Sequence, residues 1–126
     1  MTSIIKKRVV LSLSTMTLFS ACKHQPNFSQ LKTVSYSTEI APIISSNCTY
    51  SGCHGDTNAV EFKLRNYKEV MRFGAIKEGY PEASNLYATL KSLKSNIVMP
   101  KPPYNKLSDT QIELIYIWIG QGALNN

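Results

Sequence analysis

The chain has 126 residues and a mass of 14.1 kDa, a size that favours a single domain. Hydrophobic residues make up 43% of it and charged residues 17%, a composition that is typical of globular proteins and argues against disorder, while three cysteines are too few for a disulfide-rich scaffold. The formal net charge is +6, but three of the 14 basic residues fall in the first eight positions, so the charge does not indicate nucleic-acid binding.

The N-terminal 22 residues have the pattern of an export signal. Lys6-Lys7-Arg8 precedes a mostly apolar, uncharged stretch over residues 9–19, which is too short to cross a bilayer of about 30 Å as a helix. The following Phe19-Ser20-Ala21-Cys22 resembles the lipobox of bacterial lipoproteins, in which the cysteine is acylated. We therefore predict a signal peptide over residues 1–21 and a lipid anchor at Cys22 that holds an exported protein on a membrane of the bacterial cell envelope, with its domain in the periplasm or on the cell surface. The alternatives are an ordinary secreted protein and a short buried helix with an unused Cys22.

The segment after the export signal is expected to be a tether, and the folded domain to follow it. Residues 22–34 contain a proline and show no clean hydrophobic period, so the domain is predicted over residues 35–126. A first helix is expected before Cys48, with Pro42 in its first turn, where the missing N–H costs least. The apolar side of this helix consists of Ile40, Ile43 and Ile44.

Two short helices are predicted in the middle of the domain. Asn66 is the cap of one, which ends at Gly74. The other starts after Ser84 and frays near Ser95, and its apolar residues are Leu86, Leu90 and Leu93. The alternation of apolar residues over 60–64 is too short to predict a strand without a sheet to join.

The clearest helix is predicted over residues 109–120. Ser108 and Gln111 have the spacing of a capping box, and Gly120 and Gly122 offer a stop. The apolar residues recur with helical spacing and comprise Ile112, Leu114, Ile115, Tyr116, Trp118 and Ile119.

Residues that carry chemistry are concentrated in one stretch, Cys48-Thr49-Tyr50-Ser51-Gly52-Cys53-His54. Two cysteine sulfurs can add to the vinyl groups of haem and form thioether bonds, and the histidine after the second cysteine can then bind the iron. The usual signature is C-x-x-C-H, whereas four residues separate the cysteines here, so the spacer must bulge. Gly52 can take the positive φ that such a bulge needs.

A haem iron that is held by one histidine takes a sixth ligand, and Met99 is the candidate. It lies in the segment Ile97-Val98-Met99-Pro100-Lys101-Pro102-Pro103. Its thioether is soft and neutral, so it favours ferrous over ferric iron and raises the reduction potential. The three prolines restrict the backbone, which suits a loop that must position a weak ligand. The alternative for Met99 is a filler of the hydrophobic core.

In its order of motifs the chain resembles the monohaem class I cytochrome c domains of secreted and lipid-anchored bacterial proteins. The resemblance covers about residues 36–124 and rests on Cys-x-x-x-x-Cys-His-Gly, Met-Pro-x-Pro-Pro, Leu-Ser-Asp and Tyr-x-Trp-Ile-x-x-Gly-Ala. It implies an all-α, class I cytochrome c-like fold of four to five short helices around one covalent haem c. In that family Cys48 and Cys53 would anchor the haem, and His54 and Met99 would be its axial ligands.

The resemblance also implies a contact between the first and last helices, and it leaves the partner of the axial histidine unidentified. The first helix would cross the last, with Ile40 and Ile44 against Ile115 and either Tyr116 or Trp118. The family often has a proline after the motif whose carbonyl orients the axial histidine, and none occurs here between His54 and Pro81. The partner of His54 is therefore not identified from the sequence, although one is expected.

With both axial positions filled, the iron has no open site for a substrate and can only exchange electrons. We therefore expect a membrane-tethered electron carrier and not an enzyme, with redox proteins as its partners and no nucleic acid. One alternative is a haem enzyme or gas sensor with an open sixth site. Another is a structural lipoprotein with a Cys48–Cys53 disulfide, and a third is a zinc site, for which Cys48, Cys53 and His54 would supply only three ligands.

Overall fold

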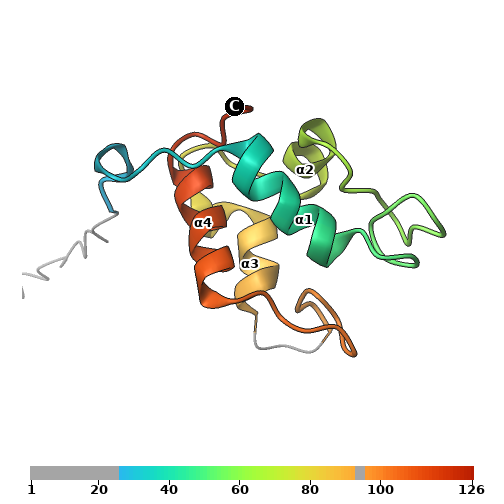
Figure 1. Cartoon of the computed structure of the whole chain (residues 1–126). Coiled ribbons are helices and arrows are strands. Elements are labelled where there is room, and N and C mark those ends of the chain that lie inside the picture. The colour runs from blue at the N-terminus through green and yellow to red at the C-terminus, as the bar shows by residue number, and fades with distance from the viewer. Residues whose placement is uncertain (1–25, 93–95) are drawn as a thin grey trace, which may run out of the picture.

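The computed structural model describes residues 26–92 and 96–126, and within these ranges 46% of the residues are helical and none forms a strand (Figure 1). The elements in chain order are η1 (Phe28–Gln30), η2 (Tyr36–Ile40), α1 (Ala41–Cys48), α2 (Tyr67–Phe73), η3 (Pro81–Ala83), α3 (Asn85–Lys91) and α4 (Asp109–Gly120). The predicted all-α class is thus confirmed. The predicted signal peptide and Cys22 lie outside the described residues.

Helix α4 begins and ends where the sequence predicts. The Ser108 side chain accepts a hydrogen bond from the Gln111 backbone N–H at 3.2 Å, and the Ser108 N–H donates to Gln111 Oε1 at 2.9 Å. This capping box satisfies donors that the helix start would otherwise leave without partners, a contribution of about 1 kcal/mol.

The first helical segment is made of η2, a π-helical turn, which continues directly into α1. Pro42 lies in the first turn of α1, as predicted. Ile40, Ile43 and Ile44 are all buried, so the apolar side that the sequence indicates faces the core. The segment ends at Cys48, the first residue of the candidate site.

Helix α2 also follows its prediction. The Asn66 side chain accepts the Glu69 N–H at 3.0 Å, and Gly74 is the C-terminal cap. The stretch 60–64 before it is a loop and not a strand, and no strand is found among the described residues.

Helix α3 is shorter than predicted, since it ends at Lys91 and not near Ser95. Ser84 precedes it but does not cap it with its side chain. The Ser84 hydroxyl instead accepts the Lys77 N–H at 2.9 Å and donates to the Tyr80 carbonyl at 3.0 Å. Leu93, expected on the apolar side of this helix, lies outside the described residues.

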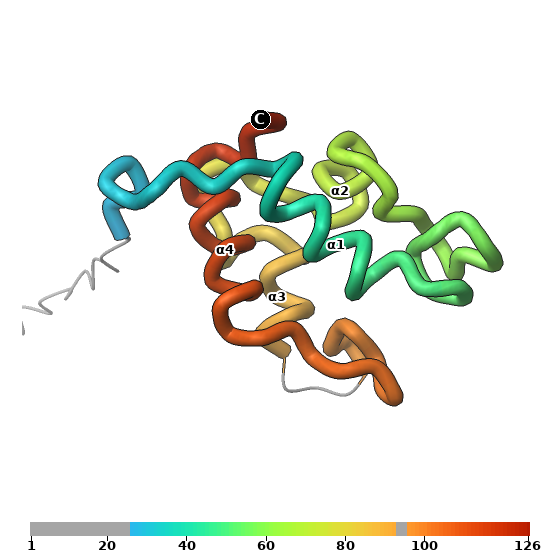
Figure 2. Tube along the Cα trace, in the orientation of Figure 1, coloured from blue at the N-terminus to red at the C-terminus, as the bar shows by residue number. Residues whose placement is uncertain are grey.

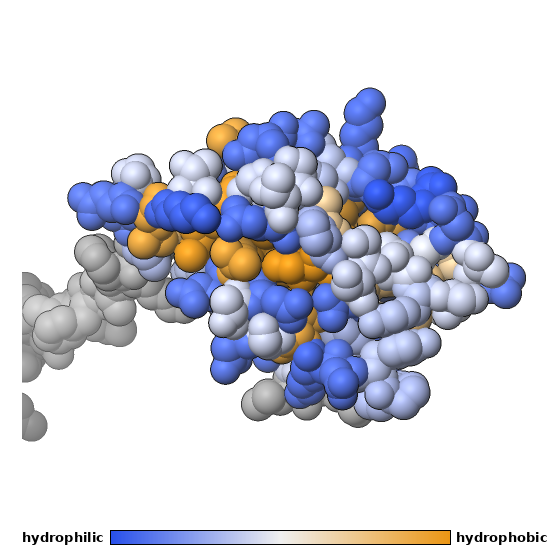
Figure 3. Space-filling model, in the orientation of Figure 1, coloured by the Kyte–Doolittle hydropathy of each residue, from blue (hydrophilic) through white to orange (hydrophobic). Residues whose placement is uncertain are grey.

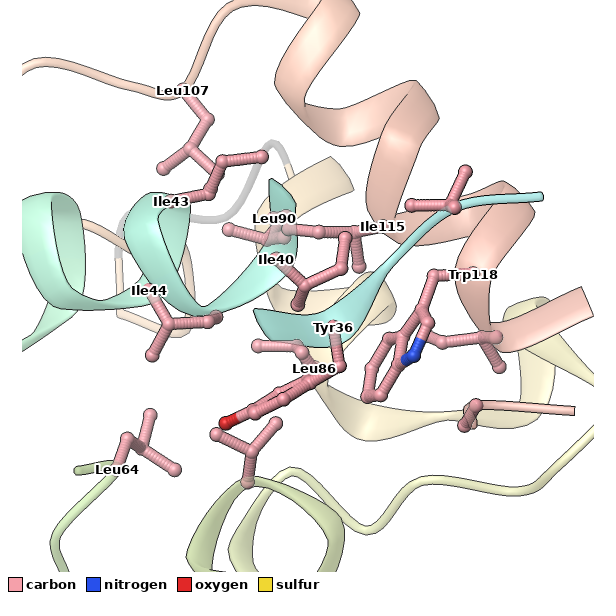
Figure 4. Packing of buried hydrophobic residues seen from close by; sticks show 14 residues of the cluster. Tyr36, Ile40, Ile43, Ile44, Leu64, Leu86, Leu90, Leu107, Ile115 and Trp118 are labelled. Carbon is pink, nitrogen blue, oxygen red and sulfur yellow. The ribbon is translucent and has the colours of Figure 1, made fainter. Parts of the chain in front are cut away.

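The core lies where η2, which leads into α1, meets α4, and α1 adds Ile43 and Ile44 to the same cluster (Figure 4). Ile115 is fully buried and Trp118 is 1% exposed, and the Trp118 ring packs on Tyr36 with the ring centroids 5.5 Å apart. Ile40 lies beside Ile115, as the predicted contact of the first and last helices requires. Of the two aromatic residues considered, Trp118 lies in this cluster, whereas the Tyr116 ring packs on Phe28 and Tyr87.

Residues 28–34, here called the N-terminal strap, are folded onto α4 and are not a free tether. Phe28 is 9% exposed, and its ring lies so close to Gly120 that an added Cβ there would collide with it. The Gln121 side chain donates to the Lys32 carbonyl at 3.0 Å and accepts the Val34 N–H at 2.9 Å. The tether predicted over residues 22–34 therefore ends before Phe28. The sequence did not reveal this because the two buried side chains, Phe28 and Val34, are separated by a mostly polar stretch whose one apolar residue, Leu31, is exposed.

Apolar surface remains near the strap. On the face drawn in Figure 3, apolar side chains gather over the strap and the adjoining parts of α4 and α1. Leu31 and Leu124 are exposed and line a shallow hollow beside Phe28. Within the two described ranges, no helix has both the length and the apolar character needed to cross a membrane.

Candidate functional site

The four residues predicted to bind haem line one hollow. The loop after α1, which carries two of them, lies at the end of the molecule away from the N-terminal strap (Figure 2). Cys48 ends α1, Cys53 and His54 lie in the loop that follows, and Met99 lies in the segment between α3 and α4. All four line one hollow with about 470 Å³ of empty space, including the solvent at its mouth. The structure therefore brings the predicted residues together, and their binding of haem stays a prediction.

A second hollow adjoins the first and shares Cys48, His54 and Met99 with it. Its empty space is about 490 Å³, which again includes the solvent at its mouth. Its other walls are mostly apolar and include Phe62, Leu64, Phe73, Leu86 and Leu90. The two hollows form one cleft with sulfur and imidazole groups where they join.

The spacer between the cysteines folds into a braced turn. The Cys53 N–H donates to the Tyr50 carbonyl at 2.9 Å, and Gly52 has a φ of +79°, the conformation predicted for it. This is the hydrogen bond of a β-turn with glycine at the position that needs positive φ. The Gly52 N–H in turn donates to the Thr57 carbonyl at 3.0 Å, so the following loop supports the turn.

The end of the motif folds back on its beginning. The His54 N–H donates to the Cys48 carbonyl at 3.0 Å. Gly55 is buried, and a Cβ added to it would meet the Thr49 backbone at a distance that real Cβ atoms do not tolerate. Glycine is therefore required after His54 because the backbone at Thr49 passes so close.

His54 has the partner that the sequence did not identify. Its side chain is buried at 8% exposure, and Nδ1 lies 3.1 Å from the Phe62 carbonyl oxygen. A carbonyl only accepts hydrogen bonds, so Nδ1 carries the proton and Nε2 keeps a lone pair that can bind a metal. The Phe62 ring also stacks on the imidazole, with centroids 4.3 Å apart and planes at 14°. Phe73 continues this stack on the far side of Phe62 at 5.2 Å.

Arg65 fastens the loop that contains Phe62. Its guanidinium bonds Asp56 at 2.6 Å and also bonds Glu69 on α2, so the start of the loop is tied to the helix that follows it. The hydrogen bond from Arg65 lowers the pKa of Glu69 to about 2 and is also the largest cause that lowers the pKa of Asp56. Both carboxylates are therefore ionised at neutral pH.

The two cysteines are not joined to each other. Both thiols are free in the described structure, so the predicted alternative of a Cys48–Cys53 disulfide is not formed. Burial, and then the nearby Cys53, raises the pKa of Cys48 to about 12, so this thiol is protonated at neutral pH. Across residues 26–92 and 96–126, no three His, Cys, Asp or Glu side chains are grouped to hold a metal ion, and the zinc alternative gains no support.

Met99 is half-buried, and its backbone is fixed at the end of α3. The Met99 N–H donates to the Thr89 carbonyl at 3.2 Å, and the residues on either side, Val98 and Pro100, are buried. Lys101 follows and lines the mouth of the first hollow. The side chain of Met99 thus lines the same cleft as His54, although the two residues are far apart in sequence.

Some residues of the site carried no usable sequence signal. The Phe62 carbonyl is a backbone group, which every residue has. The one clue is the apolar alternation of Val60, Phe62 and Leu64, a pattern that is typical of a strand. All three residues line the cleft. An apolar alternation with no sheet to join is therefore an indication of a cavity wall.

Comparison with protein-family models, with curated proteins and with solved structures found no match for this chain. The interpretation of the site thus depends on the residues and the geometry described above.

Proposed function

We propose that this protein is a membrane-tethered monohaem c-type cytochrome that carries single electrons between redox partners in the cell envelope. The observation that carries the proposal is the meeting of two thiols, one oriented imidazole and one thioether at a mostly apolar cleft. In this proposal Cys48 and Cys53 hold haem through thioether bonds, and His54 and Met99 are its axial ligands. Haem bound in this way supplies an iron that takes up and releases one electron.

The residues present fit such a group. The Phe62 carbonyl fixes the proton of His54 on Nδ1, which leaves Nε2 for the iron, and partners of this kind orient metal-binding histidines in general. The apolar walls limit the access of water and lower the local dielectric constant. Met99 adds a soft, neutral ligand, and both effects favour the ferrous state and a higher potential.

The fold supports the proposal at a coarser level. The part of the chain that the structure describes is all-α, and the segment before Cys48 packs on α4, the contact that the resemblance to class I cytochromes c implies. A cytochrome c-like fold would place haem in the cleft between the loop after α1, the helices α2 and α3, and the segment that carries Met99. The cofactor would then complete a core that a domain of about 100 residues builds only in part by itself.

The membrane attachment would leave the cleft accessible. In this proposal the lipid is on Cys22, six positions before Phe28, a length of chain that reaches at most about 20 Å. The strap lies at one end of the molecule, and the loop after α1, which carries Cys53 and His54, lies at the other (Figure 1). A redox partner can thus approach the cleft from the side away from the membrane.

The proposal is tested by a pair of methionine variants made with a c-type maturation system. The wild-type protein should show the weak far-red absorption of methionine bound to ferric iron. Met99→Ala should keep covalent haem, lose this band, bind imidazole and have a lower potential. Met71→Ala, which removes a half-buried methionine from α2, is the control and should keep the band. A Met99→Ala protein with the wild-type band and potential would contradict the assignment of the sixth ligand.

A further inference from the structure

Two exposed tyrosines connect the loops that carry the candidate ligands. Tyr50 lies in the spacer between the cysteines, and Tyr104 lies in the segment after Met99. Their rings are stacked, with centroids 4.4 Å apart and planes at 9°, although each residue is 40% exposed. Aromatic side chains that stack at the surface hold parts of the chain together through their faces, and here those parts are far apart in sequence.

The segment after Met99 is mostly exposed, so burial does little to hold it against the rest of the protein. Its ends are fixed, since the Met99 N–H bonds the Thr89 carbonyl and Leu107 is buried. Between them, all six residues 101–106 are exposed. The Tyr104 N–H donates to the Lys101 carbonyl at 3.1 Å, but this bond is internal to the segment and does not attach it to the rest of the protein. The Tyr104 ring provides such an attachment.

Tyr50, in contrast, lies in a turn that backbone hydrogen bonds hold in place. It begins the turn that closes with the Cys53 N–H, and this turn is braced by the Gly52 bond to Thr57. The turn uses the four consecutive residues from Tyr50 to Cys53, and Cys48 and Thr49 precede it. A spacer of two residues between the cysteines would be too short to contain both Thr49 and this turn. The longer spacer is therefore what presents a ring to the segment after Met99.

We propose that Tyr50 and Tyr104, together called the tyrosine clasp, are positioning residues that hold the segment carrying Met99 against the haem-attachment loop and so keep Met99 on the iron. This inference rests on the proposed function, because it assumes that Met99 is the sixth ligand. It gives the unusual four-residue spacer a role, which is to control how readily the sixth ligand leaves.

The expected effect follows from the size of aromatic stacking. An external ligand such as imidazole competes with Met99 for ferric iron, so its apparent affinity rises when Met99 is held less firmly. Loss of one aromatic pair should raise the apparent affinity for imidazole about two- to tenfold. Haem attachment through Cys48 and Cys53 should not change, since neither substitution alters a cysteine. The His54 contacts should also stay the same, since His54 stacks on Phe62 and the two tyrosines stack on each other.

The experiment compares Tyr50→Ala, Tyr104→Ala and the double variant with the full-length wild-type protein. Tyr104→Phe keeps the ring and should behave as wild type. Tyr80→Ala removes an exposed tyrosine on η3's N-terminal side and is a second control. Two measurements are made on each: imidazole titration of the ferric protein, and amide hydrogen exchange of residues 99–106. Tyr50→Ala is most informative for exchange, since it leaves the sequence of that segment unchanged.

The tyrosine clasp predicts that either alanine variant raises imidazole affinity and speeds exchange, and that the double variant adds little to the single ones. Unchanged exchange in Tyr50→Ala, or effects of the two variants that simply add, would overturn it. A wild-type protein without haem would overturn the proposed function instead, and the exchange measurement would still decide whether the rings hold the segment.

Discussion

Gly55→Ala is the substitution whose effect on the candidate site follows most directly from the structure. A Cβ at this position would lie 3.0 Å from the Thr49 carbonyl carbon and closer still to its oxygen, and real Cβ atoms do not approach this closely. The obstacle is backbone and not a flexible side chain, so either the end of α1 or the loop after His54 must move. Forced overpacking of this kind costs about 1–3 kcal/mol.

The cost should appear both in stability and in the site. We expect urea unfolding, followed by circular dichroism, to show a free energy of unfolding about 1–3 kcal/mol below that of the wild type. The far-red band should weaken, since the displaced backbone adjoins His54. Thr57→Ala changes an exposed residue of the same loop and should stay within about 0.5 kcal/mol of the wild type. A Gly55→Ala protein with wild-type stability and spectrum would show that the close approach to Thr49 does not shape the site.

Two further predictions concern the strap and the ion pairs. Phe28→Ala should lower the free energy of unfolding by about 3 kcal/mol, because Phe28 is buried against α4. Leu31 is exposed, so Leu31→Ala should change this free energy by less than about 0.5 kcal/mol. Equal effects of the two substitutions in urea titrations would show that the strap is not folded onto α4. Because Arg65 holds the pKa of Glu69 at about 2, below its usual 4.5, the ion pair contributes fully above pH 4.5 and is lost as the pH falls toward 2. Arg65→Met should therefore flatten the fall of stability between pH 4.5 and 2, as measured by urea titration at each pH, and an unchanged slope would refute this.

The sequence was sufficient where the signal is local. The bounds of α4 follow from the Ser108 capping box and the terminal glycines, and those of α2 from Asn66 and Gly74. The ligands of the candidate site could also be proposed, because Cys53 and His54 are adjacent and the prolines after Met99 mark a stiff loop. The helix bounds and the Cys53–His54 pair depend on residues that are close in sequence, whereas Met99 is distant and could be proposed only from the prolines beside it.

The remaining features depend on contacts between distant parts of the chain. Phe28 is buried because Gly120 leaves room for its ring, and neither residue shows this by itself. The partner of His54 is a backbone carbonyl, which sequence cannot distinguish from any other. The end of α3 was predicted too late because Leu93 continued the helical spacing, whereas the chain becomes extended at Ser92.

The most direct test of the account is the intact mass of the exported protein, measured after denaturation so that only covalent groups remain. The account predicts the mass of the processed polypeptide with one haem attached, and the loss of that added mass when Cys48 and Cys53 are both replaced by alanine. A bare polypeptide from cells that carry a working c-type maturation system would contradict it.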